Sequence, residues 1–133
     1  MKTSSRAVLW TTLLYLVLGT IAIPHLIDDF LFGIPEEFGM SNQTAQILAG
    51  LFTLVYMAIL IPLASGRKPG LYGALVMGIF LALAGILKHI PLMLLPGPYW
   101  SGAFSEVLII GLIFSGLACS FVAFLALRGT GRQ

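Results

Sequence analysis

The stretch AVLWTTLLYLVLGTIAIPHLI (residues 7–27) contains no aspartate, glutamate, lysine or arginine. A transmembrane α-helix needs about 20 predominantly apolar residues to cross the hydrocarbon core of a bilayer. This stretch meets that requirement on its own, and three more apolar blocks follow it. The third block meets Pro91, where we expect a kink because proline cannot donate a helical hydrogen bond. The four predicted spans cover residues 7–27, 44–64, 71–90 and 103–127.

The composition of the whole chain agrees with this interpretation. Hydrophobic residues make up 59% of the 133 residues and charged residues 9%, whereas a soluble globular chain carries about 25% charged residues. We therefore predict one all-α integral membrane domain, residues 1–133, with four transmembrane helices in an up-down-up-down bundle. The alternative for residues 1–22 is a cleaved signal peptide, since MKTSSR is basic. We favour a span because the apolar block is longer than that of a usual signal peptide.

The basic residues indicate how the chain is oriented. Six of the seven flank the same side of a four-span chain: Lys2, Arg6, Arg67, Lys68, Arg128 and Arg132. Because cytoplasmic loops are enriched in lysine and arginine, both termini are predicted to be cytoplasmic. All five acidic residues then lie on the opposite side. We expect a multi-pass protein of a plasma or inner membrane.

Ionisable side chains gather at the predicted extracytoplasmic rim. His25, Asp28 and Asp29 are three and four residues apart, so they share one face if the first helix continues through them. Lys88 and His89 end the third span, and Glu106 opens the fourth. Three separate helix ends therefore bring imidazoles and carboxylates to one depth. The expected ligand-binding residues are His25, Asp28, Asp29, Lys88, His89 and Glu106.

This rim can be interpreted in several ways. Two histidines with carboxylates can hold a divalent metal ion. The same groups could pass protons or hold a polar headgroup, since ionisable residues near a membrane core are usually functional or paired. A structural clamp, in which Lys88 or His89 pairs with Asp29 or Glu106, is a third interpretation. The neighbouring Glu36 and Glu37 could simply belong to a wet loop.

The segment HIPLMLLPGPYWSG contains three prolines in a largely apolar run. It is too broken for another span and too apolar for a free loop. We expect it to lie in the outer interface or to fold back over the bundle as a lid above His89. Tyr99 and Trp100 within it are predicted to belong to an interfacial aromatic belt.

Small residues predict where the helices approach closely, because lipid provides no hydrophobic drive between helices. The third span carries one such row and the fourth another, with spacings of three or four residues. Cys119 is interpreted as a small packing residue. These rows predict an antiparallel pair of spans three and four, or self-association. The predicted packing residues are Ala74, Gly78, Ala82, Gly85, Gly111, Ser115 and Cys119.

No motif in the sequence identifies a reaction. It has no glycine-rich phosphate loop and no cysteine pair, and its net charge of +2 does not favour nucleic-acid binding. The layout is similar to DoxX-like proteins and the emopamil-binding group, in architecture only. The leading hypothesis is binding of a small ligand, ion or lipid at the extracytoplasmic rim, with its transport or modification left open. The alternative is a non-catalytic accessory or scaffold subunit. Expected partners are membrane lipids and, through small-residue faces, a second copy or another membrane protein.

Overall fold

The computed structural model describes residues 5–37, 39–97 and 99–129. These residues confirm an all-helical chain with four helices long and apolar enough to cross a membrane: Arg6–Leu31, Asn42–Ala64, Lys68–Met93 and Ala103–Gly129. The elements are α1 (Ser5–Leu31), α2 (Ile34–Glu37), α3 (Asn42–Ala64), α4 (Lys68–Ala84), the π-helical turn η1 (Gly85–His89), α5 (Ile90–Met93) and α6 (Ala103–Gly129).

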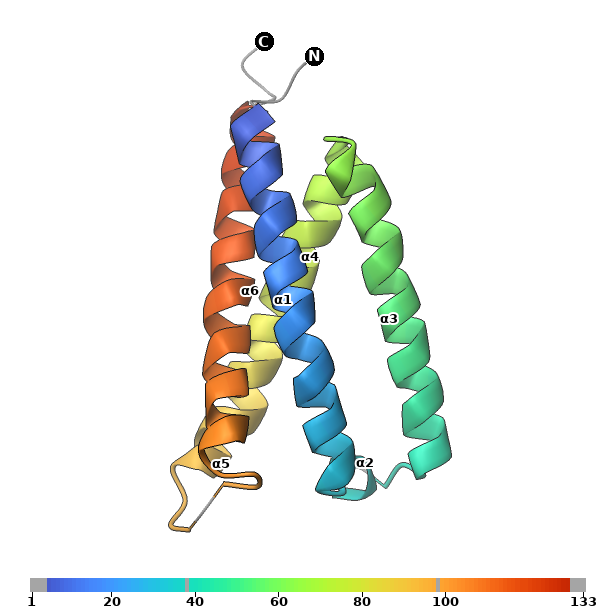
Figure 1. Ribbon diagram of the computed structural model, residues 1–133, viewed down its shortest axis with the longest axis vertical. Coiled ribbons are helices and arrows are strands. Elements are labelled where there is room, and N and C mark those ends of the chain that lie inside the picture. The colour runs from blue at the N-terminus through green and yellow to red at the C-terminus, as the bar shows by residue number, and fades with distance from the viewer. Residues whose placement is uncertain (1–4, 38, 98, 130–133) are drawn as a thin grey trace.

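The four long helices do not share their contacts equally. The most extensive contacts join α6 to α4 and to α1, while α3 packs against α4 and α1. Figure 1 shows that α4 runs obliquely, from beside α3 at its start to beside α6 near α5. The space enclosed by α1, α3 and α4 therefore differs between the two ends of the molecule.

Local chemistry determines where α3 begins and ends. The Oγ atom of Ser41 accepts a hydrogen bond of 3.2 Å from the backbone N–H of Thr44, as an N-cap residue does. At the other end, Gly66 adopts a φ of 66°, which suits a residue without a side chain. Gly70 of α4 then lies so close to α3 that an added Cβ would come 2.1 Å from the backbone nitrogen of Leu63. The turn from α3 to α4 is thus tight on both sides.

Small residues close the contact between α4 and α6. A Cβ on Gly78 would lie 2.4 Å from Ser120 Oγ and 2.6 Å from the Gly116 carbonyl oxygen. Part of the predicted α6 row faces α1 instead. Gly111 lies against Ile21, and the Cys119 thiol is 3.9 Å from a carbonyl oxygen of α1. The reason is geometric: successive residues turn by about 100°, so a helix between two partners presents adjacent rows to them.

Two tyrosines join α1 to α3. The rings of Tyr15 and Tyr56 stack with centroids 4.2 Å apart. The Tyr15 hydroxyl donates to the Tyr56 carbonyl oxygen at 3.0 Å, and the Tyr56 hydroxyl donates to the Tyr15 carbonyl oxygen. Gly19 leaves room for the Tyr56 ring, since a Cβ there would lie 2.9 Å from it. These bonds satisfy two hydroxyls that would otherwise be buried in an apolar interior without a hydrogen-bond partner.

The helix after α4 widens before Pro91. The backbone N–H of Ile90 bonds to the Gly85 carbonyl oxygen, five residues back, which defines the π-helical turn η1. Proline lacks the N–H that a regular helix would use at this point, and single π-helical turns often occur at functional sites. The turn brings His89, only 4% exposed, against His25 of α1, with the two ring centroids 4.7 Å apart.

Candidate functional site

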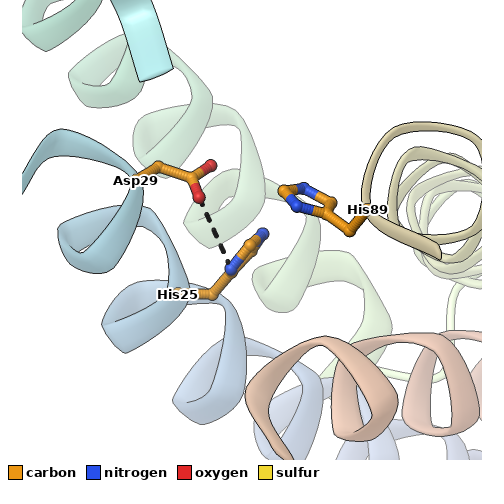
Figure 2. Close-up of side chains that lie close together, drawn as sticks. All are labelled: His25, Asp29 and His89. Atoms are coloured by element: carbon orange, nitrogen blue, oxygen red, sulfur yellow. Dashed lines mark ion pairs between the residues drawn. The ribbon is translucent and has the colours of Figure 1, made fainter. Parts of the chain in front are cut away.

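Three ionisable side chains from two helical segments lie together (Figure 2). His25 and Asp29 are four residues apart on α1, so they share one face, and His25 Nδ1 is 3.7 Å from Asp29 Oδ1. His89 reaches them from η1, its ring centroid 4.7 Å from that of His25 and its plane turned by 74°. One potential ligand atom from each residue lies within 4.8 Å of the others. We call His25, Asp29 and His89 the rim triad.

The rim triad contains buried polar atoms without a hydrogen bond. His25 Nδ1 and Asp29 Oδ1 are both inaccessible and have no hydrogen-bond partner; the 3.7 Å between them is within ion-pair range, as Figure 2 marks, but too long for a hydrogen bond. A buried polar atom left without a partner costs about 1–3 kcal/mol. The site therefore has unused capacity to bind a hydrogen-bond donor or a cation.

Aromatic residues cover the His89 side of the triad. The Tyr99 hydroxyl lies 2.6 Å from His89 Nδ1. Trp100 stacks on Tyr99 with a centroid distance of 4.5 Å and meets the His89 ring edge-on at 5.4 Å. Burial, followed by the charges of the nearby carboxylates of Asp29 and Asp28, raises the pKa of Tyr99 above its ordinary value. The hydroxyl thus keeps its proton at neutral pH.

Asp28 has a different role from Asp29. It is 3% exposed, and its two carboxylate oxygens accept hydrogen bonds from the hydroxyls of Ser101 and Ser105. The backbone N–H of Ser101 also donates to Ser105 Oγ at 3.1 Å. Asp28 therefore anchors the segment of residues 99–102, which we call the pre-α6 segment, to α1. That anchor holds Tyr99 where it can contact His89.

The remaining predicted site residues lie further from the triad. Lys88 Nζ forms an ion pair of 3.9 Å with Glu37 Oε2, which joins η1 to α2 at the rim. Glu106 lies in the first turn of α6 and lines neither of the two cavities described below. Of the six predicted ligand-binding residues, three converge, two make neighbouring pairs, and Glu106 stands apart.

A cavity of about 220 Å³ opens beside the rim triad, between α1, α3 and α4. His25, Asp29 and His89 provide its polar end, and its walls are almost entirely apolar. A second cavity of about 270 Å³ lies toward α2 and shares Leu26, Asp29 and Phe52 with the first. Asp29 therefore borders both. The apolar walls of the first cavity include Ala22, Leu26, Phe52, Met57, Phe80 and Leu81.

The sequence did not identify three residues that shape the site. Tyr99 was predicted as an interfacial aromatic within a segment that could cover His89, but not as a hydrogen-bond partner of that histidine, and neither Ser101 nor Ser105 was singled out. Their partners lie 10, 73 and 77 positions away in the sequence, beyond the reach of any helical spacing. The available signal was the unusual run YWS next to the start of a predicted span.

Compared with models of protein families, with curated proteins and with solved structures, this chain matches none of them. The fold and the site therefore define its class: a helical, multi-pass membrane protein with a His-Asp-His cluster, of which both histidines are buried, at one end of its helices.

Proposed function

We propose that this protein binds a small amphipathic molecule from the bilayer. The polar group, a hydroxyl or an amine, lies at the rim triad, and the apolar body lies in the cavity between α1, α3 and α4. The observation that supports this proposal is the cavity itself, which is lined mainly by apolar side chains and whose histidine and carboxylate lining residues are His25, Asp29 and His89. Small-molecule sites are typically apolar hollows with a few well-placed polar groups.

The polar end must provide most of the selectivity. Lipid tails are as apolar as the cavity walls, so transfer of an apolar chain from the bilayer into the protein gains little. A hydrogen bond to a buried acceptor in a low dielectric is stronger. Asp29 Oδ1 and the unbonded nitrogen of His25 are such acceptors. A ligand that donates hydrogen bonds would satisfy both atoms.

The proposal includes an orientation. The four-helix chain runs up-down-up-down with both termini cytoplasmic, so the rim triad lies on the extracytoplasmic side. The distribution of lysine and arginine supports this. The exposed Glu36 beside the rim provides a test. A Glu36→Cys variant should react with a membrane-impermeant maleimide applied from outside intact cells, and reaction only after lysis would reverse the orientation.

Photo-cross-linking tests the binding. We would label the purified protein with a diazirine-bearing dodecanol and, in parallel, with the matching dodecane. The alcohol should label residues around the cavity about tenfold more efficiently than the alkane, which corresponds to about 1.4 kcal/mol. Equal labelling by both probes would mean that the rim triad does not select a polar group.

Neighbouring residues on α4 provide a matched pair of variants. Ala84 lines the cavity, whereas Leu83 is 47% exposed on the outer surface of the helix. Ala84→Phe fills the cavity and should abolish selective labelling by the alcohol. Leu83→Phe adds the same ring toward lipid and should leave it unchanged. Labelling that persists in Ala84→Phe would place the bound probe elsewhere.

The scaffold alternative gains no such support. It needs a small-residue face that is open to a partner. Gly78 is instead occupied by Gly116 and Ser120, and Gly111 by Ile21 of the same chain.

A further inference from the structure

We infer that the rim triad binds a divalent first-row transition-metal ion of the Zn²⁺ type through one atom each of His25, Asp29 and His89. Two imidazole nitrogens and one carboxylate oxygen are a donor set that such ions favour. The inference goes beyond the proposed function, because these three side chains could bind the ion whether or not the amphipathic molecule is present.

The distances are close to those of a coordination site. Ligand atoms around a tetrahedral Zn²⁺, bound at about 2.0–2.1 Å, lie about 3.4 Å from one another. His25 Nδ1 and Asp29 Oδ1 are 3.7 Å apart, and all three ligand atoms lie within 4.8 Å. Two ligands come from consecutive turns of one helix and the third from the facing π-helical turn. A contraction of no more than about 1.4 Å brings the triad to coordination distance.

The unbonded atoms point to the same occupant. His25 is 8% exposed, and its Nδ1 has no hydrogen-bond partner, like Asp29 Oδ1 beside it. An ion bound between them would satisfy both. The neighbouring Asp28 adds a second buried carboxyl group, which accepts hydrogen bonds from the hydroxyls of Ser101 and Ser105. Two adjacent carboxylates in an apolar interior favour a cation over a neutral group.

The surroundings of His89 resemble those of a metal ligand. A metal-binding histidine usually has its other ring nitrogen held by a polar group, which selects the tautomer and the ring orientation. Tyr99 does this at His89 Nδ1, at 2.6 Å. When that nitrogen carries the proton and donates it to the Tyr99 oxygen, the lone pair of Nε2 is available to an ion.

Three protein ligands leave a coordination position for another molecule. Catalytic zinc sites have three protein ligands and a fourth coordination position that water or substrate occupies. The cavity shares all three triad residues as its lining. A water molecule could occupy the fourth position, and so could the hydroxyl or amine of the amphipathic molecule, which is the one part of this inference that rests on the proposed function.

Titration with Co²⁺ tests the site directly. The purified full chain in detergent, stripped with EDTA, should bind one equivalent of Co²⁺ with the visible absorption of a four-coordinate ion. Added Zn²⁺ should displace it. Because an ion that binds only the folded state stabilises it, Zn²⁺ should also raise the Tm. If no saturable Co²⁺ site is found at one equivalent, the inference is wrong.

Variants distinguish this site from adventitious binding. Asp29→Asn and His89→Gln should abolish Co²⁺ binding, and Tyr99→Phe should weaken it by about 10- to 100-fold, as loss of a supporting hydrogen bond does. Glu106→Gln and Glu37→Gln remove carboxylates from the same rim and should leave it unchanged. Circular dichroism and gel filtration verify that each variant is folded. Full binding in both Asp29→Asn and His89→Gln would place the ion elsewhere.

One further measurement separates this inference from the proposed function. Labelling by the diazirine-bearing dodecanol is repeated with EDTA and with Zn²⁺. Selective labelling in EDTA together with no Co²⁺ site would retain the amphipathic ligand and reject the metal. A Co²⁺ site without selective labelling under either condition would retain the metal and reject the amphipathic ligand.

Discussion

Two regions of the molecule have a similar apolar composition but pack differently. The contact between α4 and α6 is closed, whereas the space between α1, α3 and α4 contains a cavity. In the first, glycine and serine remove side-chain volume, so backbones approach until no Cβ fits at Gly78. In the second, aromatic and histidine side chains keep the helices apart, and a cavity of about 220 Å³ lies between them. Residue size thus determines which helix pair is closed and which is open.

The comparison also shows where polar groups are placed. In the α4–α6 contact, Ser120 Oγ bonds to carbonyl oxygens of both helices, at 3.1 Å to Leu75 and 2.9 Å to Gly116. At the rim triad, two polar atoms have no such partner. This difference between the two regions, hydroxyls that are hydrogen-bonded in one and buried polar atoms that are not in the other, supports the proposal that a ligand binds at the rim triad.

The largest effect should come from breaking the closed contact. Gly78→Leu puts a side chain where a Cβ alone would lie 2.6 Å from the Gly116 carbonyl oxygen. The backbone of α6 cannot move away without separating the two helices. We therefore expect the free energy of unfolding to fall by about 3 kcal/mol or more, which is the upper end of the range for overpacked cores. Unfolding in mixed micelles measures it.

Gly50 provides the matched control for that change. It lies on the exposed face of α3, and a Cβ there would meet nothing within 4 Å. Gly50→Leu should therefore leave the free energy of unfolding within about 0.5 kcal/mol of the wild type. Equal effects of the two substitutions would mean that α4 and α6 do not meet at Gly78.

The second effect concerns the anchor of the pre-α6 segment. Asp28→Ala removes the acceptor of the Ser101 and Ser105 hydroxyls. Hydrogen bonds to a charged group contribute about 1.5–3 kcal/mol each, offset here by the cost of burying the carboxylate, so we expect a loss of about 2 kcal/mol.

The same variant should release Tyr99 and Trp100 from His89. In a Trp10→Phe background the emission reports Trp100, and it should shift to longer wavelength as the ring meets water. Glu106→Ala, on the same side of the molecule, should change neither the free energy of unfolding nor the Trp100 emission wavelength. An unchanged Trp100 emission in Asp28→Ala would contradict the anchoring role.

A smaller effect should follow from removing one hydrogen bond between α1 and α3 beside the cavity. Tyr56→Phe removes the hydroxyl that bonds to the Tyr15 carbonyl oxygen but retains the ring stack. Interhelical hydrogen bonds in membranes average about 0.6 kcal/mol and reach about 1.7 kcal/mol. We expect about 1 kcal/mol in unfolding measurements. Tyr72→Phe, at a tyrosine that is 56% exposed, should leave the free energy of unfolding unchanged. An effect as large as that of Tyr56→Phe would mean that loss of any tyrosine hydroxyl destabilises the protein, whether or not it joins two helices.

The sequence was sufficient for the parts of the fold that depend on local periodicity. Apolar length predicted four long helices, and the spacing of His25 and Asp29 predicted a shared face, which the structure brings together with His89. Asp28 and Asp29 are adjacent, yet one anchors the pre-α6 segment and the other faces the cavity. A turn of about 100° per residue separates them, and the sequence did not reveal which face met which neighbour.

Contacts between distant segments could not be predicted in this way. The sequence predicted that this segment could fold back over His89, but the pre-α6 segment has no helical period, so no spacing indicated the specific bonds of Tyr99 to His89 and of Ser101 to Asp28. The two rows of α6 are equally small and apolar, because lipid and neighbouring helices impose the same composition. The sequence therefore placed Gly111 and Cys119 against the third span, whereas they lie against α1.

The smallest effect should come from the exposed ion pair at the rim. Glu37 Oε2 and Lys88 Nζ are 3.9 Å apart, but the Glu37 side chain is 58% exposed, so water and salt screen the attraction. Exposed pairs contribute about 0–1 kcal/mol, and we expect Glu37→Gln to change the free energy of unfolding by less than about 0.5 kcal/mol. Raising the salt concentration should reduce even that difference. A loss as large as that of Asp28→Ala, insensitive to salt, would mean that α2 closes the second cavity through this pair, and the open region would then be gated from the rim rather than from the bilayer.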